Sequence, residues 1–165
     1  MTTAAKQIVS SLNEVFAPMD AEVLASSLVW IEERAAALNA FVNSAEYDEL
    51  RRKDVTRAYD RRFAIAGGKG WHNVIMGSNA PMRAEAITKN CAAVAAKRNA
   101  TIAAKLVKAD VTAVTETTYT RTTDGFDGVF RVETNKGNKV VKVNTIRAGG
   151  YNIQCLHLRV LTTVK

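Results

Sequence analysis

The segment AIAGGKGWHNVIMG, from Ala64 to Gly77, places Lys69 among glycines and follows it with a tryptophan and a histidine. A phosphate-binding P-loop has the sequence GxxxxGK[ST] between a strand and a helix, so that successive backbone N–H groups wrap the phosphate. With Gly68-Lys69 as the GK pair, the first glycine would fall on Phe63 and the hydroxyl residue on Gly70. The segment is therefore not a nucleotide-triphosphatase motif.

Two interpretations of this segment remain. Exposed N–H groups and Lys69 could contact a phosphate, while Trp71 stacks on a nucleic-acid base. Alternatively, the segment is a flexible connector that Trp71 anchors in the core. We favour the connector and keep Lys69 and Trp71 as candidate nucleic-acid contacts.

The chain offers little for metal or nucleophilic chemistry. Its histidines and cysteines are His72, Cys91, Cys155 and His157, and a structural zinc site needs about four such ligands in one place. Cys91 falls on the apolar stripe of a predicted helix, where a thiol behaves as a small hydrophobic group. We therefore predict no metal site, no cofactor and no catalytic residue.

A metal-dependent nuclease is the enzymatic alternative, because acidic residues and a lysine cluster in the predicted sheet. Nucleases of the restriction-endonuclease type need a first carboxylate and then an acidic residue, any residue and a lysine. Here Glu133-Thr-Asn-Lys136 has one residue too many, and Asp124 and Asp127 each precede a glycine, as is typical of turns. A protein without enzymatic activity is the expected class.

Positive charge is concentrated after residue 60. The net charge is +7; residues 1–60 hold six Lys/Arg and ten Asp/Glu, whereas residues 61–165 hold seventeen and six. A basic segment of this size attracts DNA, RNA or an acidic protein. At 100° per residue, one arc of a helix predicted over 81–108 collects most of the candidate phosphate contacts, and the sheet adds two of second rank. They are Arg83, Lys97, Arg98, Lys105 and Lys108 on the helix, and Lys142 and Arg159 on the sheet.

Helices are predicted for the first third of the chain. Pro18 is expected to end a first helix over 3–16, and Asp20 to cap the next one. The second helix repeats apolar residues at spacings of three and four, and this seam needs a partner. The partner is either a neighbouring helix of the same chain or the same helix of a second subunit, and we expect a homodimer through residues 20–43. The predicted oligomerisation residues are Leu24, Leu28, Ile31, Leu38 and Val42.

A third helix is predicted from about Ala45 to Phe63, with Ser44 as its N-cap. Lys53, Arg57 and Arg61 form a basic row along it. Acidic residues stand four positions from basic ones on this helix, so we interpret the row as a solvated face held by ion pairs rather than as a polyanion contact.

The rest of the chain predicts one long helix and one sheet. An alanine-rich helix runs over 81–108, and from Val111 the apolar period changes to two with many β-branched residues. Turn signals divide this region into four strands of an antiparallel meander that packs on the helix. The fold class is α+β, with a helical region over 1–63, a Gly-rich connector over 64–80 and a helix-plus-sheet domain over 81–165.

Three segments, GGKGWHNVIMG, AAVAAKRNATIAAKL and AGGYNIQCLHLRVL, resemble segments of small bacteriophage-encoded proteins. The resemblance covers roughly residues 60–165 and brings no fold, activity or site residue with it. It implies a context, which is a phage accessory protein acting in the cytoplasm of an infected bacterium.

Two function classes follow. The first is a non-enzymatic phage protein that binds DNA or RNA through a basic helix face. The alternative is an inhibitor that uses the same residues against an acidic host enzyme or anti-phage defence protein. No run of about 18 uncharged apolar residues occurs, and the N-terminus lacks the apolar region of a secretory signal. We therefore expect a cytoplasmic protein without membrane contact.

Overall fold

The structure is a computed structural model that describes the backbone of residues 2–122, 125–147 and 154–163. Side chains are described for residues 2–115, 117–120 and 128–141. Within these residues the chain forms five helices and a four-stranded antiparallel sheet, which confirms the predicted α+β class.

The chain divides into two compact units. Unit 1 consists of residues 1–18 and 94–165, and unit 2 consists of residues 19–93. The first helix, α1 (Thr3–Val42), and the last, α5 (Ala80–Lys108), each contribute residues to both units. The sequence predicts three consecutive segments with boundaries at residues 63 and 80. In the structure, unit 1 instead combines residues 1–18 with residues 94–165.

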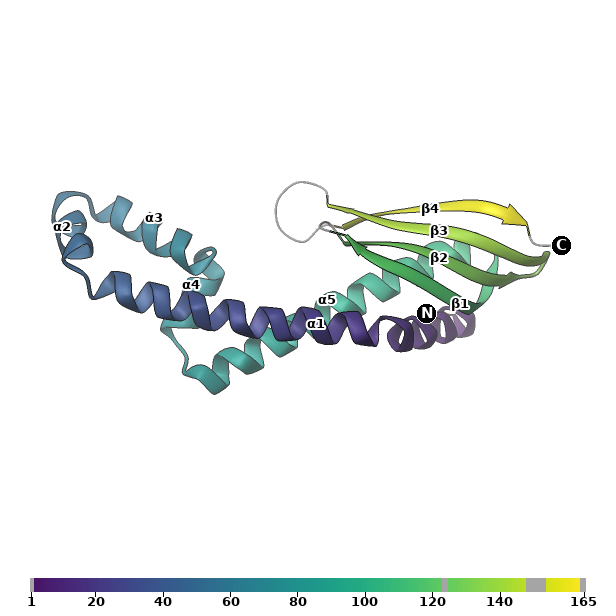
Figure 1. Cartoon of the computed structure of the whole chain (residues 1–165), viewed down its shortest axis with the longest axis horizontal. Coiled ribbons are helices and arrows are strands. Elements are labelled where there is room, and N and C mark those ends of the chain that lie inside the picture. The colour runs from purple at the N-terminus through teal and green to yellow at the C-terminus, as the bar shows by residue number, and fades with distance from the viewer. Residues whose placement is uncertain (1, 123–124, 148–153, 164–165) are drawn as a thin grey trace. The chain divides into compact units, whose positions relative to one another are not determined.

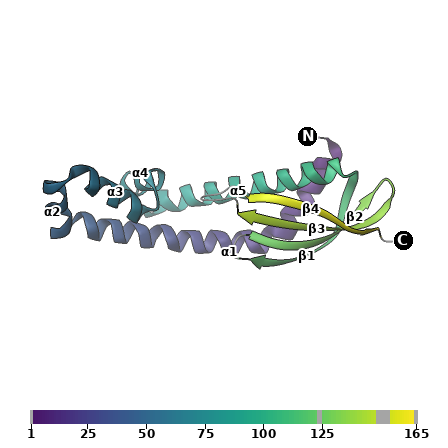
Figure 2. The same ribbon diagram turned by 90° about the horizontal axis from the view of Figure 1, so that it is seen from above.

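The sheet belongs to unit 1. Its strands are β1 (Val111–Thr122), β2 (Gly125–Thr134), β3 (Gly137–Arg147) and β4 (Gln154–Thr163). Neighbouring strands pair antiparallel in chain order, as Figures 1 and 2 show. After the two-residue turn between β2 and β3, Gly137 has a φ of +100°, which glycine adopts without steric cost. The predicted meander is confirmed.

One face of this sheet is buried. The buried residues of β2 and β3 are Phe130, Val132 and Val141. Val129 and Arg131, which alternate with them, are exposed, as in other antiparallel sheets with one solvated face. The fully buried Phe16 of α1 packs on this face, with its ring centroid 5.3 Å from that of Tyr119 and 6.2 Å from that of Phe130.

The helix α5 confirms the predicted helix over 81–108. In unit 1, its residues Ile102 and Leu106 are fully buried, whereas Ala96, Ala100 and Ala104 are exposed. The helix therefore packs through its larger apolar side chains and turns most of its alanines outward. Burial of these larger side chains removes more apolar area from water than burial of alanines would.

Pro18 does not end a helix, and this prediction was wrong. It lies inside α1, which continues without a break from Thr3 to Val42, so Asp20 is a helix residue and not a cap. A proline inside a helix removes one backbone hydrogen bond and costs about 3 kcal/mol. Phe16 and Met19, on either side of it, are both buried. Burial of such side chains along the whole helix offsets the cost of the proline.

Unit 2 is helical. Besides its share of α1 and α5 it contains α2 (Ala45–Lys53), α3 (Val55–Ala66) and α4 (Lys69–Met76). The single helix predicted over 45–63 is divided at Asp54, whose Oδ1 accepts a hydrogen bond from the Arg57 N–H at 3.0 Å. Asp54 is thus the N-cap of α3. In Figures 1 and 2, α3 and α4 fold back beside the C-terminal part of α1.

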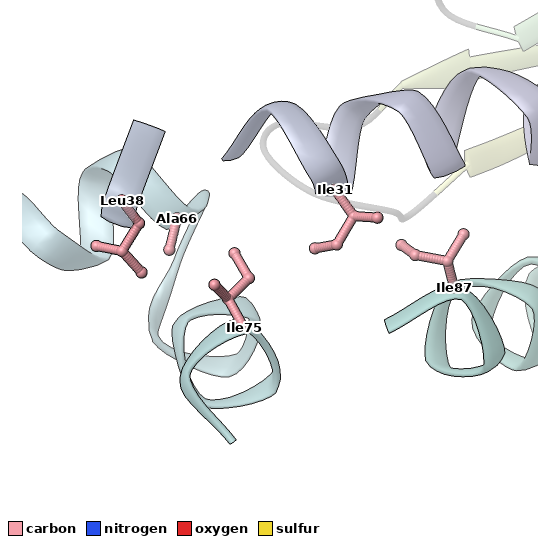
Figure 3. Packing of buried hydrophobic residues seen from close by; sticks show 5 residues of the cluster. All are labelled: Ile31, Leu38, Ala66, Ile75 and Ile87. Carbon is pink, nitrogen blue, oxygen red and sulfur yellow. The ribbon is translucent and has the colours of Figure 1, made fainter. Parts of the chain in front are cut away.

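The core of unit 2 is formed by the apolar seam of α1. Figure 3 shows Ile31 and Ile87 pointing toward one another from α1 and α5, and Leu38 beside Ala66 and Ile75. The other seam residues pack around this cluster: Leu24, Leu28, Ala35 and Val42. Of the two predicted partners for the seam, the neighbouring helices of the same chain are the ones that cover it.

The glycine-rich segment holds a turn and a helix. Gly67 ends α3 in the left-handed conformation, with a φ of +86°, and α4 begins at Lys69. The predicted connector over 64–80 is therefore partly helical. Trp71 packs against the core of unit 2, edge-on to Trp30 with 5.7 Å between ring centroids. The predicted anchoring of Trp71 in the core is confirmed.

Candidate nucleic-acid interface

The whole net charge of the protein belongs to unit 1. This unit contains thirteen Lys/Arg and six Asp/Glu, whereas unit 2 contains ten of each. The split at residue 60, with a net charge of −4 before it and +11 after it, overestimates this contrast, because five basic residues that follow residue 60 belong to unit 2, where acidic residues balance them. A polyanion is therefore attracted to unit 1 and not to unit 2 as a whole.

Within unit 1, the described positive charge is densest on α5. Residues 94–108 contain four Lys/Arg and no Asp/Glu. The three lysines, Lys97, Lys105 and Lys108, lie within about 80° of one another around the helix at 100° per residue. We call these three residues the lysine ridge. Lys97 and Lys108 are exposed and Lys105 is half-buried.

Small side chains surround the lysine ridge. Ala100, Thr101 and Ala104 are exposed between its members, and the Thr101 hydroxyl donates to the Lys97 carbonyl at 2.7 Å. In the described part of the chain, neither Lys97 nor Lys108 forms an ion pair. Their ammonium groups can therefore reach a ligand without first breaking a salt bridge to a described carboxylate.

Arg98 has a structural role that sequence reasoning missed. Its guanidinium carbon lies 4.5 Å from the ring centroid of Phe16, and its Nε donates to Asn99 Oδ1 at 3.0 Å. Asn99 is 1% exposed and donates from Nδ2 to Asn13 Oδ1 at 2.7 Å. The arginine thus joins α5 to α1 beside the buried Asn99, and we leave it out of the ridge.

Arg83 lies in unit 2 and is neutralised by a carboxylate. Its Nε and Nη2 donate to the two carboxylate oxygens of Glu32, each at 2.8 Å, and its Nη1 donates to the Ser78 carbonyl at 2.9 Å. The hydrogen bonds with Glu32 raise the pKa of Arg83 and lower the pKa of the Glu32 carboxyl. An arginine held in this way is a poor phosphate contact, and it too is outside the ridge.

The other sequence candidates are dispersed. Lys69 is exposed at the start of α4 in unit 2, and Trp71 is packed in the core of that unit. Lys142 and Arg159 are cross-strand partners on β3 and β4, but their side chains lie outside the described residues. The sequence arc from Arg83 to Lys108 therefore reduces to the lysine ridge.

Two of the three residues in the basic row of α2 and α3, Lys53 and Arg61, form the ion pairs that a solvated face predicts. Lys53 Nζ lies 2.6 Å from Glu49 Oε1, and Arg61 Nη2 lies 3.3 Å from Glu46 Oε1. The guanidinium of Arg61 also lies 5.6 Å from the ring centroid of Phe41. These contacts favour a solvated face over a polyanion site.

Unit 2 also contains a cleft of 460 Å³ between α1, α4 and the start of α5. Its wall includes Ala35, Leu38, Val42, Ile75, Met76 and the Glu32–Arg83 pair. Apart from that pair and an asparagine the lining is apolar, so the cleft is not part of the basic surface. Its chemistry adds nothing to phosphate binding.

The described residues contain neither a candidate membrane span nor a candidate metal site. No helix among them is both long enough and apolar enough to cross a membrane, and no three His, Cys, Asp or Glu side chains among them gather as metal ligands. Comparison of the chain with protein-family models, curated proteins and solved structures finds no match.

Proposed function

We propose that this protein binds nucleic acid, without enzymatic activity, through the lysine ridge of α5. The observation that carries the proposal is the distribution of charge: unit 1 holds the entire net charge of +7, and the part of α5 in this unit, residues 94–108, includes no carboxylate. The resemblance to bacteriophage-encoded segments suggests an accessory protein that acts in the cytoplasm of an infected bacterium.

The binding mechanism is electrostatic. Each lysine that contacts a phosphate releases condensed counterions, so the affinity falls with salt at a log–log slope of about −0.9 per contact on duplex DNA. Three ridge lysines predict a slope of about −2.7. Such contacts position the protein on the backbone but read no base sequence.

Charge reversal on the ridge tests this proposal. The double variant Lys97→Glu/Lys108→Glu should weaken binding at least about tenfold and lower the salt slope by about 2, because each lost phosphate contact removes about 1. The measurement is fluorescence polarisation with a labelled duplex between about 50 and 200 mM salt.

Lys89→Glu is the matched control for this experiment. Lys89 is an exposed lysine of the same helix, but it belongs to unit 2 and lies on another side of α5 from the ridge. Its reversal should change the affinity less than about threefold, because Lys89 contacts no phosphate. A small effect remains because Lys89 lies within about one to two Debye lengths of the ridge, where salt screens its charge only in part. Equal losses in the two variants, or binding that ignores salt, would contradict the ridge as the binding surface.

An inhibitor of an acidic host protein is the second candidate, and one observation favours it. Val94 is 43% exposed and lies on the same side of α5 as Lys97 and Lys105 at 100° per residue. An apolar side chain among lysines suits a protein interface better than a phosphate backbone. A pull-down from nuclease-treated bacterial lysate distinguishes the two candidates, because only a protein partner persists. If such a partner is lost in a Val94→Asp variant, the inhibitor is favoured.

The predicted homodimer through residues 20–43 is not part of this proposal. Ile31 and Leu38 are fully buried within the chain, so the centre of the seam is not on the surface. Dimerisation stays a prediction that sedimentation can test.

A further inference from the structure

The cleft of unit 2 follows the helix α1. Its lining residues on α1 begin at Glu32 and end at Val42, which is a length of about 15 Å along the helix axis. Its volume of 460 Å³ falls in the range of small-molecule sites. A helix of the same length, about 10 Å across, occupies about 1,200 Å³. The cleft therefore has the size of one small, elongated molecule and is too small to enclose a partner helix.

The charged groups of the cleft lie at one end. Glu32 is the first lining residue along α1, and Arg83 is bonded to both of its carboxylate oxygens. Beyond this pair the walls are apolar apart from Asn39, and Leu38 and Val42 continue them along α1. A ligand that matches these walls is apolar over most of its length and polar at one end.

The Glu32–Arg83 pair determines the chemistry of the polar end. Arg83 makes three donations, two to Glu32 and one to the Ser78 carbonyl, and its guanidinium has further N–H groups. A ligand oxygen can accept from these groups, and a ligand hydroxyl can donate to the Glu32 carboxylate. Because the pair is neutral as a whole and its carboxylate repels anions, an uncharged polar head matches it better than a carboxylate or a phosphate.

One wall of the cleft can adapt to a ligand. Met76, at the end of α4, lines the cleft and is exposed, as is Ala36 on α1. Methionine is unbranched and flexible, so its side chain fits ligands of different shapes. An alkyl chain in the cleft would cover both side chains, and the removal of their apolar surface from water would favour binding.

We propose that this cleft is a binding site for an uncharged single-chain amphiphile. Its head, which carries a hydroxyl or an amide, contacts Glu32 and Arg83, and its alkyl tail of about ten carbons runs along α1 toward Val42. The inference is independent of the lysine ridge, because every lining residue belongs to unit 2. Unit 2, which has no net charge, would then have a binding function of its own.

NMR signals of the methionine methyl groups test this proposal in the unchanged chain. Met76 lines the cleft, whereas Met82 does not, and their exposed fractions are nearly equal at 52% and 53%. Titration with octyl glucoside below its micelle concentration should shift the Met76 signal until it saturates and leave the Met82 signal unchanged. Decyl glucoside should bind at least about fourfold more tightly, because its tail buries further methylenes. Equal shifts of both methionines would overturn the proposal.

Ala36→Trp and Ala37→Trp are a matched pair of variants. Both alanines are exposed neighbours on α1, but only Ala36 lines the cleft. The first variant should fill the cleft and weaken octyl glucoside binding at least about tenfold, because the tail loses its buried position. The second should leave the affinity within about twofold.

Two results of these titrations would contradict the proposal. An unchanged affinity in Ala36→Trp would show that octyl glucoside binds outside the cleft. Tighter binding of octanoate than of octyl glucoside would overturn the uncharged head, because repulsion by the Glu32 carboxylate should weaken an anion of the same chain length.

Discussion

The indole ring of Trp30 lies directly against the backbone of Gly67. A Cβ built at Gly67 would stand 2.7 Å from Trp30 Cζ2, and the φ of +86° is itself unfavourable for any other residue. This glycine lets α3 end in a left-handed turn while α1 passes close beside it. Packing in unit 2 therefore explains why the glycine-rich segment has a glycine at position 67.

Gly67→Ala should destabilise unit 2 by at least about 1–2 kcal/mol, the usual cost of a left-handed non-glycine residue, and the contact with Trp30 adds to it. Urea unfolding followed by tryptophan fluorescence measures the change, since Trp30 and Trp71 both lie in this unit. Gly70→Ala is the control: nothing lies within 4 Å of its Cβ position and it is helical, so it should be neutral or stabilise by up to about 1 kcal/mol. Equal destabilisation by both variants would contradict this account.

Arg83→Ala should leave nucleic-acid affinity within about twofold of the unchanged protein, because the guanidinium is paired with Glu32 and lies outside the ridge. Its effect should be on stability instead. A bidentate but partly exposed pair contributes roughly 0.5–1 kcal/mol, which urea unfolding can detect. A loss of affinity as large as that of Lys97→Glu would return Arg83 to the binding surface.

The Glu32–Arg83 pair also predicts a dependence of stability on pH. The pKa of Glu32 is lowered in the folded protein from the ordinary value of 4.5, so its carboxylate form is the one that folding favours. The stabilisation is fully present above pH 4.5 and is lost as the pH falls through the lowered folded pKa. The difference in unfolding free energy between the unchanged protein and Glu32→Gln should therefore be constant from pH 7 to about 5 and shrink below 4.5. A difference that grows with acidity would show that the carboxylate is not stabilised by folding.

Leu38→Ala should cost about 2–5 kcal/mol, as expected for a fully buried leucine. Val29→Ala, on the same helix at a 59% exposed position, should stay within about 0.5 kcal/mol. If the seam is satisfied within one chain, the midpoint of unfolding will not depend on protein concentration in either case. A midpoint that rises with concentration, together with a dimer in sedimentation velocity, would instead support the dimer predicted through residues 20–43.

Local patterns predicted α5 and the four strands well, because their causes are local. The helix over 80–108 follows from alanine content and a helical apolar period, and the four strands from an apolar period of two. The interruption at Asp54 had a local signal as well, since aspartate is a good N-cap, but a continuous helical pattern on both sides hid it. Pro18 was misread because the burial of Phe16 and Met19 depends on the whole fold.

The candidate site was predicted less well, because pairing between distant residues decides which charges are available. Glu32 and Arg83 are 51 positions apart, and no spacing rule connects them. Asn13 and Asn99 are 86 apart, and Arg98 bonds to Asn99 and lies over Phe16 of α1. The lysines at 97, 105 and 108 were predicted correctly as helix neighbours, since their spacing alone places them on one side of α5.

Unit 1 contains both ends of the chain, and this determines the order in which the protein can assemble during synthesis. Residues 1–18 leave the ribosome before unit 2, but the partners of Phe16 on β1 and β2 are translated only after the whole of residues 19–93. Because domains generally fold as units as they emerge, unit 2 can fold while the first turns of α1 still lack the sheet on which they pack. The sheet residues that pack on Phe16, Tyr119 and Phe130, are therefore made about a hundred codons after the segment that they cover.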